Sequence, residues 1–108
     1  MSAAFERRAV ELSGIAPDRL DDPAALAALT IAAAVACGIS AEGAPAMRAG
    51  IAGVAVGVIG VDGHVVLHTA PADGTCLVDV VVREPRQPDR ALDVIARRLG
   101  AYPAASEP

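Results

Sequence analysis

The feature that most constrains the fold is an uncharged, apolar run at Ile51–Val61. Its residues alternate as they would along a β-strand: valines at every second position would point to one side, and Ala55, Gly57 and Ile59 to the other. Both sides are apolar, so a strand with this sequence has to be buried on both of its faces. The run therefore predicts a sheet that needs a cover on each side.

A turn and two further strands are predicted to follow this run. Asp62-Gly63 has the composition of a two-residue hairpin turn of type I′, so we expect His64–Thr69 to return beside the first strand. Pro71–Gly74 turns the chain again, and Cys76–Arg83 alternates as a third strand. The three strands together are predicted to form an antiparallel run.

Two helices are predicted to flank the strands. The first is an alanine-rich helix at Ala24–Cys37, where Asp22 is suited to cap the N-terminus, Pro23 to occupy the first helical position and Gly38 to end the helix. The second is predicted at Pro88–Leu99, because acidic residues near its start and arginines near its end complement the helix dipole.

The first segment, Phe5–Ile15, permits two interpretations. Its pattern allows a short helix, but apolar residues also alternate with Glu11 and Ser13 as in a strand. A strand here predicts an α/β fold: a two-layer sandwich with a mainly antiparallel sheet and two helices on one face. The other face then needs its own cover, and a second copy of the chain is the simplest one. We expect a single domain at residues 1–101 and a disordered tail at 102–108.

Composition excludes several classes of function. The 108-residue chain has no lysine, which excludes a lysine Schiff base and ordinary pyridoxal phosphate catalysis. Its nine basic residues form no patch and its formal charge is −4, so nucleic acid is not expected as a partner. Cys37 and Cys76 form no zinc or redox motif and are expected to be buried thiols. With no leader and no apolar stretch of transmembrane length, we expect a cytoplasmic protein with no membrane partner, no metal and no cofactor.

A longer motif lies in residues 60–79, which read Gly-Val-Asp-Gly-His-Val-Val-Leu-His-Thr-Ala-Pro-Ala-Asp-Gly-Thr-Cys-Leu-Val-Asp. The segment resembles the central motif of bacterial, pyruvoyl-dependent S-adenosylmethionine decarboxylase proenzymes. That motif contains Ser-Glu-Ser-His, then His-Thr-Trp/Phe-Pro-Glu and Gly, then a strand with Asp and a terminal Cys, and the spacing matches without a gap. The similarity extends over residues 7–101 and implies the family's fold. The matching positions are His64, His68, Pro71, Gly74 and Asp79, with Asp62 in place of the family's Glu.

The departures from this motif concern the family's chemistry. Members of the family cleave their own chain before the second serine, which becomes the pyruvoyl group that accepts electrons during decarboxylation. Gly63 occupies that position and has no hydroxyl, so the resemblance implies neither self-cleavage nor a pyruvoyl group in this chain. Four further positions differ: Arg83 replaces the catalytic cysteine, Ala70 the aromatic residue that stacks on adenine, Ala72 the acid that holds the ribose, and Ala55 a serine.

Three functions remain open on this basis. The first is an S-adenosylmethionine decarboxylase-like pseudoenzyme that acts as a binding or regulatory homodimer, with an active decarboxylase paralogue or a small-molecule ligand as a further partner. The second is a repurposed, pyruvoyl-free enzyme of small-molecule, specialised metabolism that uses His68 and Asp62 for acid–base chemistry. The third is a structural homodimer without a ligand. For a working site we assign ligand contacts to His64, Arg83 and Glu11; a plain turn at Asp62 and purely structural histidines remain the alternatives.

Overall fold

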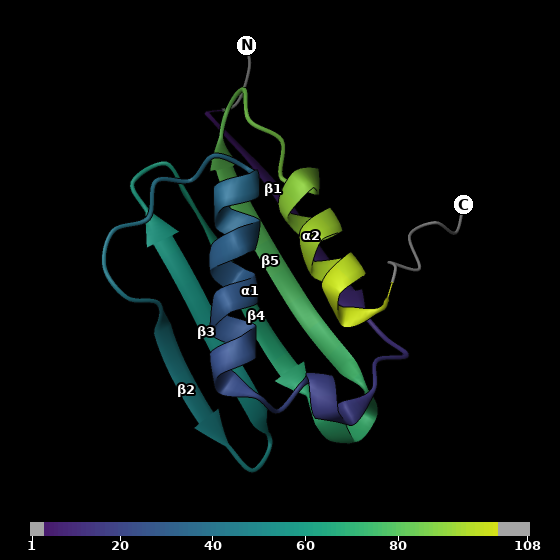
Figure 1. The fold of residues 1–108 in the computed structure, drawn as a ribbon. Helices are drawn as coiled ribbons and strands as arrows, with labels where there is room; N and C mark the ends of the chain where they lie inside the picture. The colour runs from purple at the N-terminus through teal and green to yellow at the C-terminus, as the bar shows by residue number, and fades with distance from the viewer. Residues whose placement is uncertain (1–3, 102–108) are drawn as a thin grey trace, which may run out of the picture.

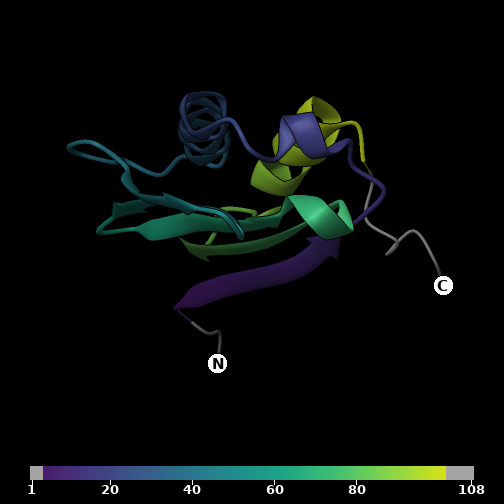
Figure 2. The same cartoon turned by 90° about the horizontal axis from the view of Figure 1, so that it is seen from below.

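The computed structural model describes residues 4–101 and has one five-stranded sheet with two helices packed on one of its faces (Figures 1 and 2). The strand order across the sheet is β1-β5-β4-β3-β2, and every neighbouring pair is antiparallel. This confirms the predicted fold class. The elements are β1 (Phe5–Leu12), α1 (Pro23–Ala36), β2 (Ala46–Gly50), β3 (Gly53–Gly60), β4 (Gly63–Ala70), β5 (Thr75–Arg83) and α2 (Asp89–Leu99).

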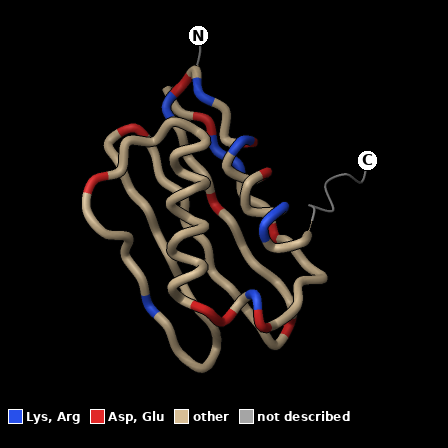
Figure 3. The backbone as a smooth tube through the Cα atoms, viewed as in Figure 1, with Lys and Arg blue, Asp and Glu red and all other residues tan. Residues whose placement is uncertain are grey.

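Helix α1 begins and ends as its sequence predicts, to within one residue. The carboxylate of Asp22 accepts a hydrogen bond from the backbone N–H of Ala25 at 3.2 Å, and Pro23 occupies the first helical position. No charged residue lies within α1, whereas α2 carries acidic residues near its start and arginines near its end (Figure 3). Gly100 ends α2 with a left-handed backbone, φ 73°. Residues 4–101 contain no helix that is both long enough and apolar enough to cross a membrane.

The core lies between the helices and one face of the sheet. Alternate residues of the three central strands point into it, as the periodicity predicted, and α1 and α2 pack their leucines and alanines against them. The first segment is a strand rather than a helix, because pairing with β5 places Leu12 in the core opposite Cys76. The fully buried residues of the sheet include Val65, Leu67, Val78, Val80 and Val82.

Strand β2 was not predicted, and its absence from the prediction has a physical reason. All five of its residues are exposed and none is β-branched, so neither burial nor strand propensity marks it in the sequence. It is an edge strand that exists because its backbone pairs with β3. The expected strand Ile51–Val61 is correspondingly shorter, since Ile51 and Val61 lie in exposed turns at its two ends.

The hairpin between β3 and β4 also differs from the prediction. Gly60 pairs with Gly63, so the two loop residues are Val61 and Asp62 rather than Asp62 and Gly63. A type I′ turn needs positive φ at both loop residues, but within residues 4–101 only glycines have positive φ. The prediction of a type I′ turn was therefore wrong. The loop is held instead by the side chain of Asp62, whose contacts are described below.

Within residues 4–101, no further layer covers the second face of the sheet (Figure 2). We call it the open face; it consists of the alternate residues of the strands that point away from α1 and α2. Ile59 and Leu77 on this face are 65% and 47% exposed. Apolar side chains thus lie in water in the isolated chain, where the sequence predicted a surface in need of a cover.

Candidate functional site

The open face carries most of the residues that the sequence singled out. The strand register arranges them in rows, because directly paired residues of an antiparallel sheet share a face. His68 is opposite Leu77, which is opposite Glu11 on the far strand. One row further, Asp79 lies between β1 and β4, and His64 is in the row after that. Glu11 and His68 are therefore two strand spacings apart, about 10 Å, too far for direct contact.

A shallow groove of about 360 Å³ lies on the open face beside His68. His68 is directly opposite Ala55, one of the positions where the family resemblance expects serine. Among the described residues that line the groove, Arg48 is the only Arg, Lys, Asp or Glu, and its guanidinium donates to the carbonyl of Met47 at 2.9 Å. The groove is lined by Ala46, Met47, Arg48, Ala55, Val56, Gly57, Ile59, Val66 and His68. Its chemistry suits a largely apolar ligand with one polar group near the imidazole.

A polar cluster lies on the same face, nearer the middle of the sheet. Arg7 Nε donates to Asp79 Oδ1 at 2.9 Å, and His64 Nε2 is 3.6 Å from Asp79 Oδ2. The cluster can orient His64 and offset the charge of Asp79. Because Arg7 is exposed to solvent, its ion pair with Asp79 contributes little to the stability of the fold. Arg7 was not among the predicted site residues, because it is 72 positions from Asp79 and only the pairing of β1 with β5 brings the two together.

Arg83 lies at the opposite end of the open face from His68. Its guanidinium carbon is 4.7 Å from the centroid of the Phe5 ring, which is a cation–π arrangement. Six positions of β5 separate Arg83 from Leu77, the neighbour of His68, and at strand spacing this is about 20 Å. A single protomer therefore does not bring Arg83 and His68 to one ligand.

Asp62 points toward the helix layer and away from the open face. One carboxylate oxygen accepts from Arg86 Nη1 at 2.7 Å, and both accept from the backbone N–H of Ser40, at 3.2 and 3.4 Å. Burial raises the pKa of Asp62, but hydrogen bonds from the backbone N–H groups of Ser40 and Asp62 and from Arg86 outweigh it, so the pKa lies below its ordinary value. An ionised carboxylate with these partners anchors the turn.

The predicted acid–base pair of Asp62 and His68 is not formed within one protomer. Asp62 lies in the turn just before β4 and His68 lies near the other end of that strand, about 20 Å away at strand spacing. The prediction assumed that the turn at Asp62 lay beside the histidine face, whereas the side chain of Asp62 faces Arg86 and Ser40. His68 can still contact a ligand in the groove, without Asp62 of the same chain as its partner.

The backbone at Gly63 leaves no room for a side chain. A Cβ atom built on this residue would be 2.2 Å from the carbonyl oxygen of Val81 and 3.0 Å from the Cα of Val82. Carbon and oxygen atoms that are not bonded do not approach so closely. A residue with a side chain at this position would require the local backbone to shift.

Two other residues of the motif serve the fold. The buried hydroxyl of Thr69 donates to the carbonyl of Leu20 at 2.7 Å and accepts from the N–H of Val54 at 2.9 Å. Gly74 has φ +63°, and a Cβ there would be 2.9 Å from the carbonyl oxygen of Ile15. These contacts give structural reasons for Thr69 and Gly74 that do not depend on catalysis.

The two cysteines are buried free thiols, as predicted. Burial raises the pKa of the Cys76 thiol to about 12 and also raises that of Cys37, so both are neutral at physiological pH. Among residues 4–101, no group of three or more His, Cys, Asp or Glu side chains is placed to hold a metal ion.

Comparison with known proteins agrees with this architecture. The sequence profile of the S-adenosylmethionine decarboxylase family matches residues 6–106. Among solved structures, the adenosylmethionine decarboxylase from Aquifex aeolicus VF5 superposes with a TM-score of 0.83 at 20% identity, over 94% of this chain and 84% of that one. No curated protein sequence matches the chain at a significant level. The chain belongs to the S-adenosylmethionine decarboxylase family.

Proposed function

We propose that this chain is a pseudoenzyme of the S-adenosylmethionine decarboxylase family, acting as a homodimeric binding or regulatory protein. The observation that carries the proposal is Gly63, which has neither the hydroxyl for self-processing nor the space for any side chain. The altered positions Arg83, Ala70, Ala72 and Ala55 support it, because proton donor, ring stacking and ribose contact are lost together. No decarboxylation step through a pyruvoyl group is assigned to this chain.

A dimer through the open face is supported by where the family's site positions lie. Ala55 and His68 are at one end of the open face, and Arg83 is at the other, beside the start of β4 at Gly63. A two-fold partner laid face to face, with the symmetry axis running across the strands, would bring the first end of one copy against the second end of the other. The dimer would also cover Ile59 and Leu77, which the single chain leaves exposed.

The open face could also bind a homologous protein in place of a second copy of this chain. An active decarboxylase paralogue could occupy the place of the second copy, with this chain completing or regulating the paralogue's site. Co-expression of the two proteins distinguishes the cases, because a heterodimer would form at the expense of the homodimer and would change the paralogue's turnover.

Intact mass spectrometry of the purified protein tests the proposal. We expect one uncleaved chain near 10.8 kDa and no release of carbon dioxide from S-adenosylmethionine. Two fragments divided between Asp62 and Gly63, or turnover that borohydride abolishes, would overturn the pseudoenzyme assignment.

A repurposed enzyme is the second candidate, and the groove beside His68 favours it. About 360 Å³ is enough for a small metabolite, and the exposed imidazole of His68 at its edge can donate or accept a hydrogen bond or a proton. Without Asp62 of the same protomer, the acid–base role falls to His68, with His64 and Asp79 farther along the face. Screening small molecules for thermal stabilisation, wild type against His68→Ala, tests this candidate.

A further inference from the structure

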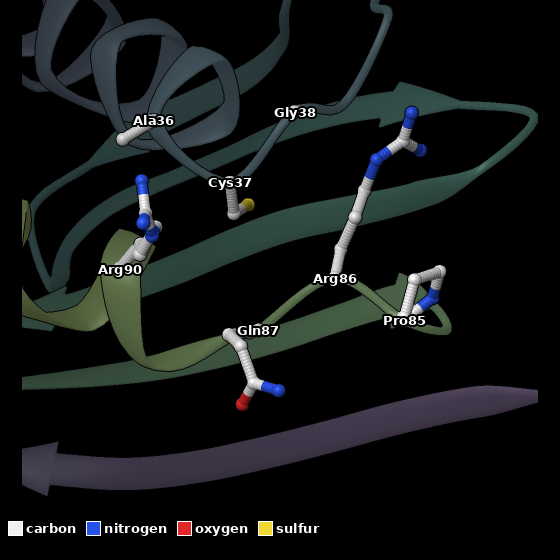
Figure 4. A pocket seen from close by; sticks show the side chains of 7 residues that line it. All are labelled: Ala36, Cys37, Gly38, Pro85, Arg86, Gln87 and Arg90. Carbon is white, nitrogen blue, oxygen red and sulfur yellow. The ribbon is translucent and has the colours of Figure 1, made fainter.

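A cavity of about 320 Å³ lies on the helix side of the molecule, away from the open face (Figure 4). It is formed where α1 ends, the loop after β5 passes beneath it and α2 begins. The lining residues are Ala36, Cys37, Gly38, Pro85, Arg86, Gln87 and Arg90. Neither the family motif nor the proposed function assigns any role to it.

Two guanidinium groups flank this cavity. In Figure 4 the side chains of Arg86 and Arg90 lie on either side of Cys37, while the amide of Gln87 points away from both. Arg86 lies across Gly38, where a Cβ atom would be 2.9 Å from Arg86 Nε. Glycine at position 38 thus provides the space in which the arginine lies along the cavity wall.

The charges around the cavity are unbalanced. No Asp or Glu lines it, and among residues 4–101 no acidic side chain forms an ion pair with Arg90. The carboxylate of Asp62 accepts from Arg86 and from the backbone N–H of Ser40. Burial keeps the Cys37 thiol neutral, because it raises the pKa. The C-terminus of α1 and the N-terminus of α2 both face this region, and their opposite partial charges offset one another. Among the lining residues, Arg90 therefore carries the positive charge that no ion pair offsets.

We propose that this cavity binds a small oxyanion, such as the phosphate group of a phosphorylated metabolite, between Arg90 and Arg86. Guanidinium groups donate pairs of parallel hydrogen bonds that match the oxygens of phosphate. Arg90 supplies the unpaired charge, and Arg86 shares its donors between the ligand and Asp62. The site is independent of the open face, so its test is independent of the proposed function.

Thermal unfolding of the full chain with inorganic phosphate, against chloride at equal ionic strength, tests the site. We expect phosphate to raise the melting temperature of the wild type by several degrees at saturation. Arg90→Gln should lose most of this shift, with an apparent affinity roughly tenfold weaker. Arg98→Gln is the matched control, because Arg98 lies on the same helix and does not line the cavity; it should keep the full shift.

Two further variants sharpen the test. Asp62→Asn removes the competing charge from Arg86, so we expect phosphate to bind several-fold more tightly than to the wild type. Arg90→Lys keeps the positive charge but loses the planar guanidinium that can donate two parallel hydrogen bonds, so it should retain part of the phosphate-induced rise in melting temperature. A phosphate effect no larger than that of chloride, an equal shift in wild type and Arg90→Gln, or weaker binding in Asp62→Asn would overturn the proposal.

Discussion

Arg86 Nη1 lies 2.7 Å from Asp62 Oδ2, and this ion pair ties the turn between β3 and β4 to the loop that precedes α2. The side chain of Asp62 is only 14% exposed, and it also accepts the N–H of Ser40, which follows the end of α1. One carboxylate therefore joins three segments that are distant in the sequence. In the family motif this position directly precedes the cleavage site, whereas here it has become an anchor.

The anchor predicts a particular dependence of stability on pH. The pKa of Asp62 in the folded chain lies below its ordinary value of 3.8, so its contribution is fully present above that pH and is lost as the pH falls through the folded pKa. Asp62→Asn should therefore lower the melting temperature at neutral pH, and the difference from wild type should shrink below about pH 4.

Melting curves between pH 3 and 7 check this prediction. Asp93→Asn is a suitable control, because Asp93 forms an exposed pair with Arg97 one helical turn away, and such pairs contribute little. A difference between wild type and Asp62→Asn that stays constant down to pH 3 would show that the carboxylate charge is not what stabilises the turn.

The backbone at Gly63 predicts that side chains are excluded there. Gly63→Ala would place Cβ against the carbonyl of Val81, so we expect a loss of about 1–3 kcal/mol in the free energy of unfolding. Gly57→Ala is the matched control: its Cβ would meet only the Val66 side chain, at an ordinary 3.5 Å. Its effect should remain within about 0.5 kcal/mol. Urea denaturation measures both, and equal stabilities would mean that the turn relaxes without cost.

Much of the fold could be predicted from the sequence because local signals and burial agree. The cap at Asp22, the glycine after α2 and the alternating valines each specify an element by its own chemistry. Edge strand β2 could not be predicted, since its exposed Ala46–Gly50 carries no pattern and depends on pairing with β3. The turn type was missed for a related reason: Asp62 is held by side-chain contacts with distant segments.

The site was less predictable than the fold. The sequence identified His64, His68 and Asp79, but not the strand register that places Arg7 beside Asp79 and leaves Asp62 far from His68. Spacing along one strand gives the face of a residue. Its partners across the sheet depend on pairings between segments up to 72 positions apart, which no local pattern encodes.

If the open face is the dimer interface, a single charged side chain introduced there should prevent dimerisation. Leu77→Glu would place a carboxylate within the proposed dimer interface, where burial without a partner is costly, so we expect a monomer at micromolar concentration. The control is Ile31→Glu on the outer side of α1, since Ile31 is 43% exposed and Leu77 is 47% exposed. It should leave the dimer intact. Sedimentation velocity distinguishes the two. A wild type that is already monomeric, or a Leu77→Glu protein that still dimerises, would exclude this face as the interface.

Substitution of His68 should distinguish the two candidate functions. Its side chain is exposed, so His68→Ala should change the free energy of unfolding by no more than about 0.5 kcal/mol and leave the assembly unchanged. If the groove is a working site, His68→Ala should abolish the thermal stabilisation produced by a ligand, beginning with S-adenosylmethionine and related amines. A regulatory pseudoenzyme gives the opposite pattern: His68→Ala matters little, and Leu77→Glu removes the regulatory effect.

His64→Ala is the companion variant, because His64 faces Asp79 rather than the groove. A ligand that stabilises the wild type and His68→Ala equally would show that His68 does not contact it, and the repurposed-enzyme candidate would then lose its acid–base group.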